Sequence, residues 1–203
     1  MRKAFLYLML LISFVGISQD DAIISEIQKA QEELNEHYTN PETTILKEED
    51  FKNFKGLEFY PISLKYRVKA AFIRTPDEKP FLMATTTDRL PEFVKYAEVH
   101  FTIDGEDLQL DLFKNMHPKS EEYSNYLFLP MTDLTSGDGS YGGGRYLDLL
   151  IPEEGIDTII LDFNKLYNPY CAYNEKYSCP IPPEQNDLPI RIEAGVKDFK
   201  KKY

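Results

Sequence analysis

The feature that most constrains the fold is a run in which every second residue is apolar, interrupted by one turn signal. Apolar and polar residues alternate on both sides of Asp104-Gly105, with the apolar positions at Val99, Phe101, Ile103, Leu108, Leu110 and Leu112. A period of two places one face of a strand in a core and the other in water. Asp-Gly between two such runs is a strong short-range hairpin signal. We therefore predict an antiparallel hairpin here.

Further strands are expected on both sides of this hairpin. The segments rich in β-formers are 64–72, 81–87, 126–131, 146–151, 158–163 and 189–193. The last is short and begins with Pro189, which suits a sheet edge. Strands and helices do not alternate along the chain, so a parallel α/β sheet is excluded. The pattern predicts a mainly β (α+β) fold, either an antiparallel β-barrel or a two-sheet sandwich.

Helical periodicity is confined to the region before the first strand. Over residues 20–38 apolar residues recur every three or four positions, at Ile23, Ile27, Ala30, Leu34 and Tyr38. Such a stripe is typical of an amphipathic helix packed on a core. Asn40-Pro41 ends this helix, and a short helical turn is expected at 48–54 before Gly56. We expect the N-terminal helix to pack on the β-structure.

The first 18 residues have the three parts of a secretory signal peptide. Arg2-Lys3 is followed by twelve largely apolar residues, 4–15, and then by the small residues Gly16 and Ser18. This order predicts cleavage near Ser18, and the apolar run is too short to span a membrane. We expect an exported protein, periplasmic or extracellular, with one β-rich domain at 19–203 and no membrane insertion of the mature chain.

Charge and motif content exclude several function classes. The formal net charge of −11 becomes −13 once Arg2 and Lys3 are removed, and such a surface repels nucleic acid. No Gly-x-Ser-x-Gly, His-Glu-x-x-His or dinucleotide-binding motif occurs. The three histidines, His37, His100 and His117, have no metal-ligand spacing. We therefore expect neither a metal nor a cofactor.

The two cysteines, Cys171 and Cys179, are an even number in a chain expected to be exported. Exported proteins form disulfides because their surroundings are oxidising. Zinc is a weak alternative, since no second pair of cysteines or nearby histidine completes four ligands. The sequence predicts a disulfide that closes a small loop.

The first candidate site is the glycine-rich stretch 133–148, which has five glycines within the eight residues 137–144. Glycines allow sharp turns and close approach of the backbone to a ligand. Gly142, Gly143 and Gly144 could cradle an anion with their N–H groups, and Arg145 could clamp it. The alternative is a hairpin or bulge in which Arg145 pairs with Asp148 or Asp162.

The second candidate site is the stretch 162–183, which is rich in tyrosine, asparagine and proline. Asn164, Tyr167 and Asn168 are the residues expected to line a ligand pocket, since aromatic and amide groups recognise sugars and peptides. The same residue types also satisfy the backbone of an ordered loop that has no regular structure. Both interpretations stay open from sequence.

These two stretches and several upstream segments resemble a bacterial family known as domain of unknown function family 1684. The matching segments are Tyr141-Gly142-Gly143-Gly144-Arg145-Tyr146-Leu147-Asp148, Asp162-Phe163-Asn164, Tyr167-Asn168-Pro169, Cys171-Ala172, Cys179-Pro180 and Leu188-Pro189, with Phe59-Tyr60-Pro61 upstream. The resemblance covers nearly all of the mature chain and implies a single module. It implies no activity.

Three functions are compatible with these observations. The first is a module that binds a small polar or anionic ligand where the two stretches meet. The second is a hydrolase that uses Asp148 or Asp162 as a general base with Arg145 stabilising charge. The third is an envelope protein-interaction module. The sequence favours the binding module, because it contains no recognisable nucleophile.

Overall fold

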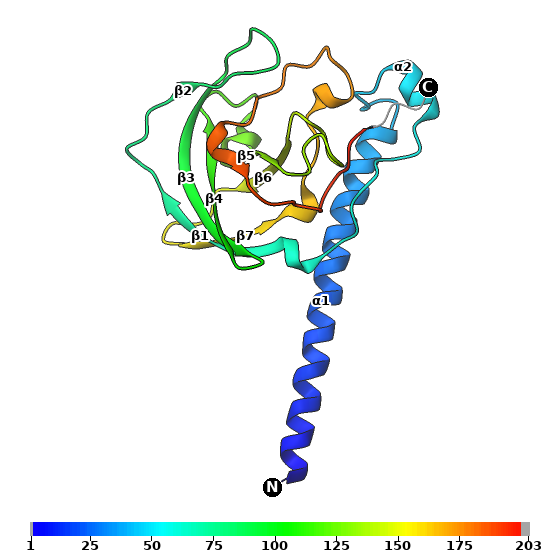
Figure 1. Cartoon of the computed structure of the whole chain (residues 1–203), viewed down its shortest axis with the longest axis vertical. Helices are drawn as coiled ribbons and strands as arrows, with labels where there is room; N and C mark the ends of the chain where they lie inside the picture. Colours follow the sequence, from blue (N-terminus) through cyan, green and yellow to red (C-terminus); the bar gives the residue numbers. More distant parts are fainter. Residues whose placement is uncertain (1, 200–203) are drawn as a thin grey trace.

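The structure is a computed structural model that describes residues 2–199, with side chains from residue 19 onward. One bent, mainly antiparallel sheet forms a half-barrel, and helix α1 lies against it (Figure 1). The strands are β1 (Arg67–Arg74), β2 (Phe81–Leu82), β3 (Glu92–Ile103), β4 (Glu106–Asn115), β5 (Tyr126–Asp133), β6 (Arg145–Leu150), β7 (Thr158–Asp162) and β8 (Asp187–Leu188).

The main strands follow the order β6-β5-β4-β3-β1-β7. All neighbours in this order are antiparallel, whereas β8 adds to β5 in parallel. The predicted mainly β fold with a packed N-terminal helix is confirmed. Of the two predicted architectures, barrel and sandwich, the sheet has the barrel-like one, as a half-barrel. Within residues 2–199 the strands form one continuous sheet that bends around the core, and no two-sheet sandwich.

The central hairpin is β3 and β4, as the alternation predicted. Phe101 pairs with Leu108 and Ile103 with Glu106. Asp104 and Gly105 both have positive φ angles, 53° and 85°. Two consecutive positive φ angles are those of a type I′ turn, whose twist matches that of the flanking strands. The alternating apolar side chains of both strands are buried inside the half-barrel.

Helix α1 (Arg2–Thr39) includes the helix expected at 20–38 and starts earlier. Its predicted apolar stripe faces the protein, with Ile27 and Tyr38 buried and the other members half-buried. The Gln31 side chain donates a hydrogen bond to the Asn164 carbonyl (3.0 Å), and the Asn35 side chain accepts one from the Leu57 N–H (2.6 Å). These contacts attach the second half of α1 to η3 (Phe163–Lys165), just after β7, and to the segment before η1 (Leu64–Tyr66).

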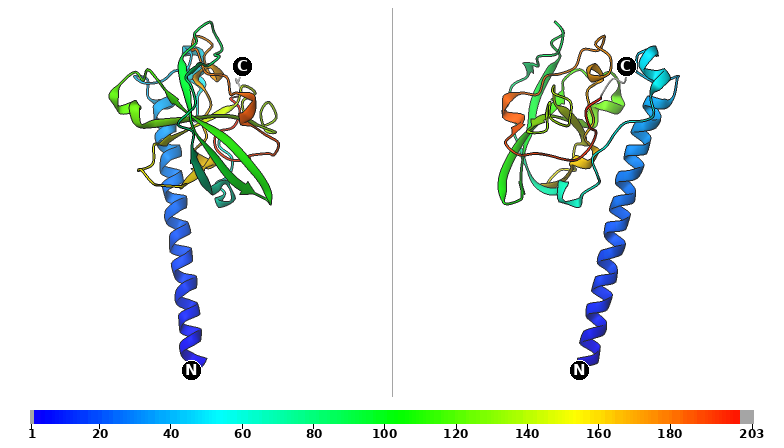
Figure 2. Two further views of the ribbon diagram at one scale, coloured as in Figure 1. Left: turned by 90° about the vertical axis from the view of Figure 1, so that its left-hand side faces the viewer. Right: turned by 45° about the vertical axis from the view of Figure 1, so that its right-hand side comes forward.

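The first half of α1 extends away from the half-barrel in every view (Figures 1 and 2). Where side chains are described, no helix is both long and apolar enough to cross a membrane. The short helix α2 (Glu48–Asn53) forms where a helical turn was expected. The remaining helical turns are 3-10: η1 (Leu64–Tyr66), η2 (Glu121–Asn125), η3 (Phe163–Lys165), η4 (Tyr170–Ala172) and η5 (Glu184–Asn186).

Two expected strands are corrected by the structure. The strand predicted at 81–87 is only the two-residue β2, followed by an isolated bridge at Thr85. The strand predicted at 189–193 is absent, and β8 lies just before it. The carbonyls of Ile192 and Ala194 accept hydrogen bonds from the Arg145 side chain instead of from a neighbouring strand. The segment is therefore extended but outside any ladder.

The open side of the half-barrel is bridged by the chain that follows β7. Tyr146 of β6 and Tyr167 exchange both backbone hydrogen bonds, at 2.9 and 3.0 Å. Because β6 and β7 are the two ends of the sheet order, this bridge joins the two edges. It also brings the tyrosine- and asparagine-rich stretch directly over β6.

Candidate functional site

The glycine-rich and tyrosine-rich stretches meet in space, over a long seam. Besides the bridge between Tyr146 and Tyr167, the Tyr146 hydroxyl donates to the Pro180 carbonyl. Gly144 lies against the Pro182 ring, so closely that a β-carbon at residue 144 would lie 2.8 Å from it. The two candidate stretches therefore form one structural unit, and the question is which of its side chains are open to a ligand.

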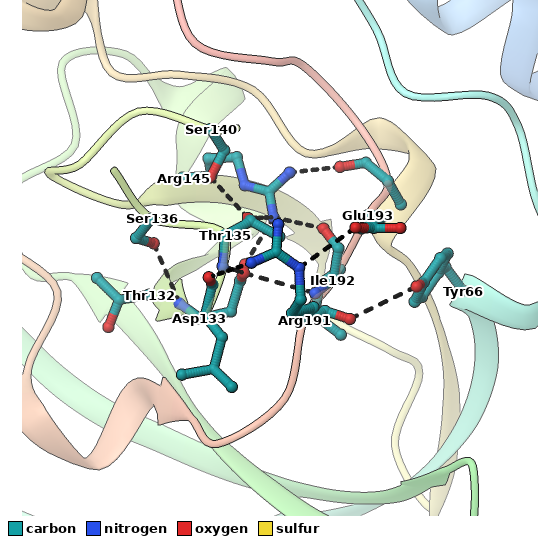
Figure 3. A network of polar contacts seen from close by, with 12 residues as sticks. Tyr66, Thr132, Asp133, Thr135, Ser136, Ser140, Arg145, Arg191, Ile192 and Glu193 are labelled. Atoms are coloured by element: carbon teal, nitrogen blue, oxygen red, sulfur yellow. Dashed lines mark hydrogen bonds and ion pairs between the residues drawn. The ribbon is translucent and has the colours of Figure 1, made fainter. Parts of the chain in front are cut away.

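Arg145 is enclosed within this unit. Its side chain is 1% exposed, and one guanidinium nitrogen donates to the Asp133 carboxylate (2.6 Å) and the Ile192 carbonyl (2.8 Å). The other terminal nitrogen donates to the Ala194 carbonyl. Figure 3 shows Arg145 together with Asp133 and Ile192. Arg145 thus fastens the C-terminal segment to β5 and β6, and no donor faces solvent for the ligand clamp that the sequence suggested.

The alternative pairing proposed for Arg145 is also corrected. Its partner is Asp133 rather than Asp148 or Asp162. The second oxygen of Asp133 accepts the Thr135 N–H at 2.6 Å, so this carboxylate is held by the loop that follows it. Sequence reasoning missed Asp133 as a partner, although it opens the glycine-rich stretch twelve residues before Arg145. The available signal was its position at the end of an apolar strand.

Of the three consecutive glycines, Gly144 serves the packing of the backbone. Gly144 is buried with φ +88°, and a β-carbon there would lie 2.5 Å from the Met131 carbonyl oxygen. Only a residue without a side chain can bring β6 this close to β5 at this point. Gly142 and Gly143 are exposed. Of the proposed anion cradle, these two positions alone have an open surface.

Asn164 and Asn168 are both buried and have structural partners. Asn164 exchanges two side-chain hydrogen bonds with the backbone of Ser63, each 3.0 Å, and its own N–H and amide donate to Asp162. Asn168 donates to the Lys197 carbonyl (2.9 Å) and the Tyr173 hydroxyl (3.2 Å). These amides satisfy the backbone of an irregular loop, which was the alternative interpretation of this stretch.

The expected disulfide is not formed in the structure. Cys171 and Cys179 are free thiols, and the Cys179 sulfur accepts the backbone N–H of Cys171 at 3.2 Å. A hydrogen bond from Cys179 lowers the pKa of Cys171, and the same interaction raises the pKa of Cys179. The Tyr141 hydroxyl lies 3.8 Å from the Cys171 sulfur. The loop is therefore closed by hydrogen bonds and not by a covalent bond.

What remains open at the seam is an aromatic surface around Asp148, called here the tyrosine face. It consists of Asp148 with Tyr123, Tyr126, Tyr167, Tyr170, Tyr177 and His37. The Tyr167 hydroxyl donates to the exposed Asp148 carboxylate at 2.7 Å. Tyr123 and Tyr170 are 54% and 38% exposed, so both rings have surface that is open to water.

Stacking orders the rings of the tyrosine face. The Tyr170 ring lies nearly parallel to His37, with centroids 6.0 Å apart, and its hydroxyl is 3.3 Å from His37 Nε2. Tyr177 meets Tyr170 edge-on at 5.3 Å, and Tyr123 lies 5.7 Å from Tyr126. Rings held in this way lose little entropy when a ligand binds.

Burial and neighbouring polar groups shift the pKa values of residues in the tyrosine face. Burial on its protein side raises the pKa of Asp148, and the hydrogen bond from Tyr167 opposes that shift. Burial likewise raises the pKa of Tyr170, with further contributions from Tyr123, Tyr177 and Asp148. The Tyr170 hydroxyl therefore stays protonated as a donor, and the Asp148 carboxylate accepts the Tyr167 hydroxyl beside it. Sequence reasoning found only Tyr167 as a ligand residue here, because Tyr123, Tyr126 and His37 come from distant segments.

The fold and this surface define a small β half-barrel module with a preformed polar and aromatic face. The chain belongs to the family described as "Protein of unknown function (DUF1684)", whose model matches residues 52–197. This confirms the resemblance noted from its motifs.

A solved structure is also similar to the chain. It is the solution NMR structure of an uncharacterized protein of Haloarcula marismortui, which is 30% identical in sequence. The similarity covers 89% of this chain and 96% of that one, with a TM-score of 0.69. No curated protein is significantly similar in sequence.

The enclosed ion pair yields the first prediction. Arg145→Ala leaves the Asp133 carboxylate buried without its partner. It also removes the donor to the carbonyls of Ile192 and Ala194. We expect a loss of about 3–5 kcal/mol in the free energy of unfolding, measured by urea denaturation. The control is Lys65→Ala, which removes the exposed pair with Asp104 and should have a much smaller effect because water screens it. Equal effects would contradict the structural role of Arg145.

The second prediction compares two glycines with similar backbone angles. Gly105 (φ +85°) has open space where a β-carbon would lie, whereas Gly144 (φ +88°) has the Met131 carbonyl there. Gly105→Ala should cost about 1–2 kcal/mol from backbone strain alone. Gly144→Ala adds a backbone clash and should exceed about 4 kcal/mol. Thermal and urea unfolding measure both variants. Similar losses of stability would show that β6 does not approach β5 closely at Gly144.

Proposed function

We propose that this protein is an exported binding module that holds a neutral, hydroxyl-rich ligand, a carbohydrate, on the tyrosine face. The observation that carries the proposal is the exposed Asp148 carboxylate, which accepts the Tyr167 hydroxyl at 2.7 Å beside the exposed rings of Tyr123 and Tyr170. A carboxylate accepts sugar hydroxyls, and aromatic rings pack against the apolar faces of sugar rings.

The charge of the tyrosine face supports a neutral ligand over an anionic one. Its ionisable acid is Asp148, and Arg145, the cation expected to attract an anion, is enclosed with Asp133. An anion would meet the Asp148 carboxylate without a compensating guanidinium. The net charge of −11 for the whole chain acts in the same direction. The earlier expectation of a polar or anionic ligand therefore narrows to a neutral polar ligand.

The hydrolase alternative has less support, because its three proposed residues have three separate partners. Arg145 pairs with Asp133, and Asp162 lies beside Arg67 (3.4 Å) and accepts hydrogen bonds from Asn164. Asp148 pairs with Tyr167. A general base and its charge-stabilising group must address the same reacting atom, and these contacts direct the three groups elsewhere.

Export is part of the proposal and rests on the signal-like segment 1–18, whose side chains lie outside the described part of the structure. Among the described residues of α1, the first fully buried side chain is Ile27. Gln31 and Asn35 also hold α1 to η3 and to the segment before η1. Cleavage near Ser18 would therefore leave these anchoring contacts in place.

The third prediction tests the tyrosine face. Tyr170→Ala removes a stacked, exposed ring, and Asp148→Asn removes the charged acceptor at constant size. Each should weaken binding of a neutral oligosaccharide about tenfold or more, since one interaction of about 1.4 kcal/mol is a factor of ten. Neutral cello-, malto-, xylo- and chito-oligosaccharides are the probes, measured by ligand-observed NMR and calorimetry.

A matched control is Tyr96→Ala, which removes a tyrosine on β3 outside the tyrosine face. This variant should bind oligosaccharides as the wild type does. Absence of binding to the whole oligosaccharide panel, or equal loss in Tyr96→Ala, would refute the proposal. Binding of a protein partner that is lost in Tyr170→Ala would instead support the envelope-interaction alternative.

The fourth prediction concerns export. Expression of the whole chain in a bacterial host should give a mature protein that starts near residue 19, with a mass lower by that of residues 1–18. Intact-mass spectrometry of the periplasm and medium measures this, and Leu8→Arg, which interrupts the apolar run, should hold the protein uncleaved inside the cell. A full-length chain in the wild-type periplasm would contradict the cleavage.

A further inference from the structure

The two thiols lie together at the seam, and they are the only cysteines in the chain. Cys171 belongs to η4, and Cys179 follows eight residues later. The Cys171 N–H donates to the Cys179 sulfur at 3.2 Å, and a further hydrogen bond joins the two side chains. The structure therefore holds two sulfur atoms within hydrogen-bond reach of one another, in the reduced form.

Cys179 is the enclosed member of this pair. It is 6% exposed, its backbone N–H donates to the Thr86 hydroxyl (3.1 Å), and its C=O accepts the Thr86 N–H (2.9 Å). The hydroxyl of the preceding residue, Ser178, accepts a hydrogen bond from Arg89 at 3.1 Å. The segment that follows β2 thus holds this sulfur in place. Cys171, in contrast, is half-buried and lies in a 3-10 turn of three residues.

A hydroxyl group faces the sulfur of Cys171. The Tyr141 hydroxyl lies 3.8 Å from it. Gly143 lies against the Tyr141 ring, where a β-carbon at residue 143 would be 2.5 Å from a ring carbon. Burial raises the pKa of Tyr141 to about 12, so the hydroxyl stays protonated and the sulfur is the acceptor. The glycine-rich stretch thus supplies a donor for a thiolate at Cys171.

The two thiols also differ in acidity. The hydrogen bond from Cys179 lowers the pKa of Cys171 to about 6 and outweighs the opposing effect of burial, with smaller contributions from Tyr141 and Thr86. The same interaction, together with burial, raises the pKa of Cys179. At neutral pH the half-buried sulfur is therefore a thiolate, and the enclosed one is a thiol. An accessible thiolate beside a protonated partner is the arrangement that thiol–disulfide exchange requires.

We propose that Cys171 and Cys179 carry out thiol–disulfide exchange, with disulfides as the substrates. The Cys171 thiolate attacks one sulfur of the substrate disulfide, forms a mixed disulfide with it and releases the other sulfur as a thiolate, which takes a proton from water. Cys171 then carries no charge, so it no longer holds the proton of Cys179.

The second step completes the exchange. The Cys179 sulfur gives its proton to solvent, attacks the Cys171 sulfur and releases the rest of the substrate as a second thiolate, which is protonated in turn. Two protein thiols are oxidised to a disulfide, and one substrate disulfide is reduced to two thiols. This activity does not rest on the carbohydrate proposal, since it uses neither Asp148 nor Tyr170.

The first test uses glutathione disulfide on the reduced protein, purified after expression of the whole chain, with acid quenching and intact-mass spectrometry. The wild type should lose two hydrogens without retaining glutathione, and dithiothreitol should restore the dithiol. Cys179→Ser keeps a hydrogen-bond donor but cannot resolve the mixed disulfide, so it should accumulate a glutathione adduct on Cys171. Cys171→Ser leaves only the enclosed thiol and should take up glutathione at least tenfold more slowly.

A pH profile separates an activated thiol from one that is merely accessible. The rate at which iodoacetamide alkylates Cys171, mapped by peptide mass spectrometry, should have its midpoint near pH 6 rather than at the ordinary value of about 8.5. Cys179→Ala removes the main donor to the thiolate, so it should raise this midpoint by roughly one pH unit or more. Tyr141→Phe should raise it by less, and Tyr96→Phe on β3 is the control that should leave it unchanged.

Several results would overturn the proposal. A wild type that stays a dithiol in glutathione disulfide would show that exchange does not occur. A wild-type disulfide that dithiothreitol opens only after denaturation would be a structural crosslink. Equal alkylation midpoints in the wild type and Cys179→Ala would show that the two thiols do not interact. If Cys179→Ser fails to fold, rapid quenching of the wild-type reaction decides instead, and absence of a mixed disulfide before the internal one would count against exchange.

Discussion

The ion pair between Arg145 and Asp133 is the interaction on which the rest of this structure depends. It joins the end of β5, the start of β6 and the carbonyls of Ile192 and Ala194 in one enclosed network (Figure 3). A buried charge pair is favourable only when its remaining donors and acceptors are satisfied. Here the C-terminal segment satisfies them, which is why that segment is extended without belonging to a sheet. The same network keeps Arg145 away from any ligand.

One exposed surface follows from this arrangement. The chain after β7 bridges the sheet edges at Tyr146 and Tyr167, and the tyrosine face forms on the outside of that bridge. This surface offers hydroxyls and rings beside a single carboxylate. Such a combination supports the proposal of a neutral polar ligand.

Local patterns predicted the elements whose structure is set by short-range physics. The Asp104-Gly105 turn, the alternation of β3 and β4, the stripe on α1 and the turn at α2 all depend on neighbouring residues, and all were found. The prediction of a strand at 189–193 was wrong, although its composition suits a strand. The hydrogen-bond partner of this segment is the Arg145 side chain rather than another strand. Arg145, Asn164 and Asn168 have the residue types of a ligand site, and buried irregular backbone needs those same types.

The sequence by itself determined the β-rich class, the packed N-terminal helix, the central hairpin and the family, because periodicity and motifs are properties of adjacent residues. Tertiary structure alone decided which polar groups have partners inside the molecule and which stay open to a ligand. Asp133 and Asp148 are both acids on neighbouring strands, yet one is enclosed by Arg145 and the other faces water beside Tyr167. Burial depends on what the rest of the chain brings to each position, and no local pattern of residues contains that information.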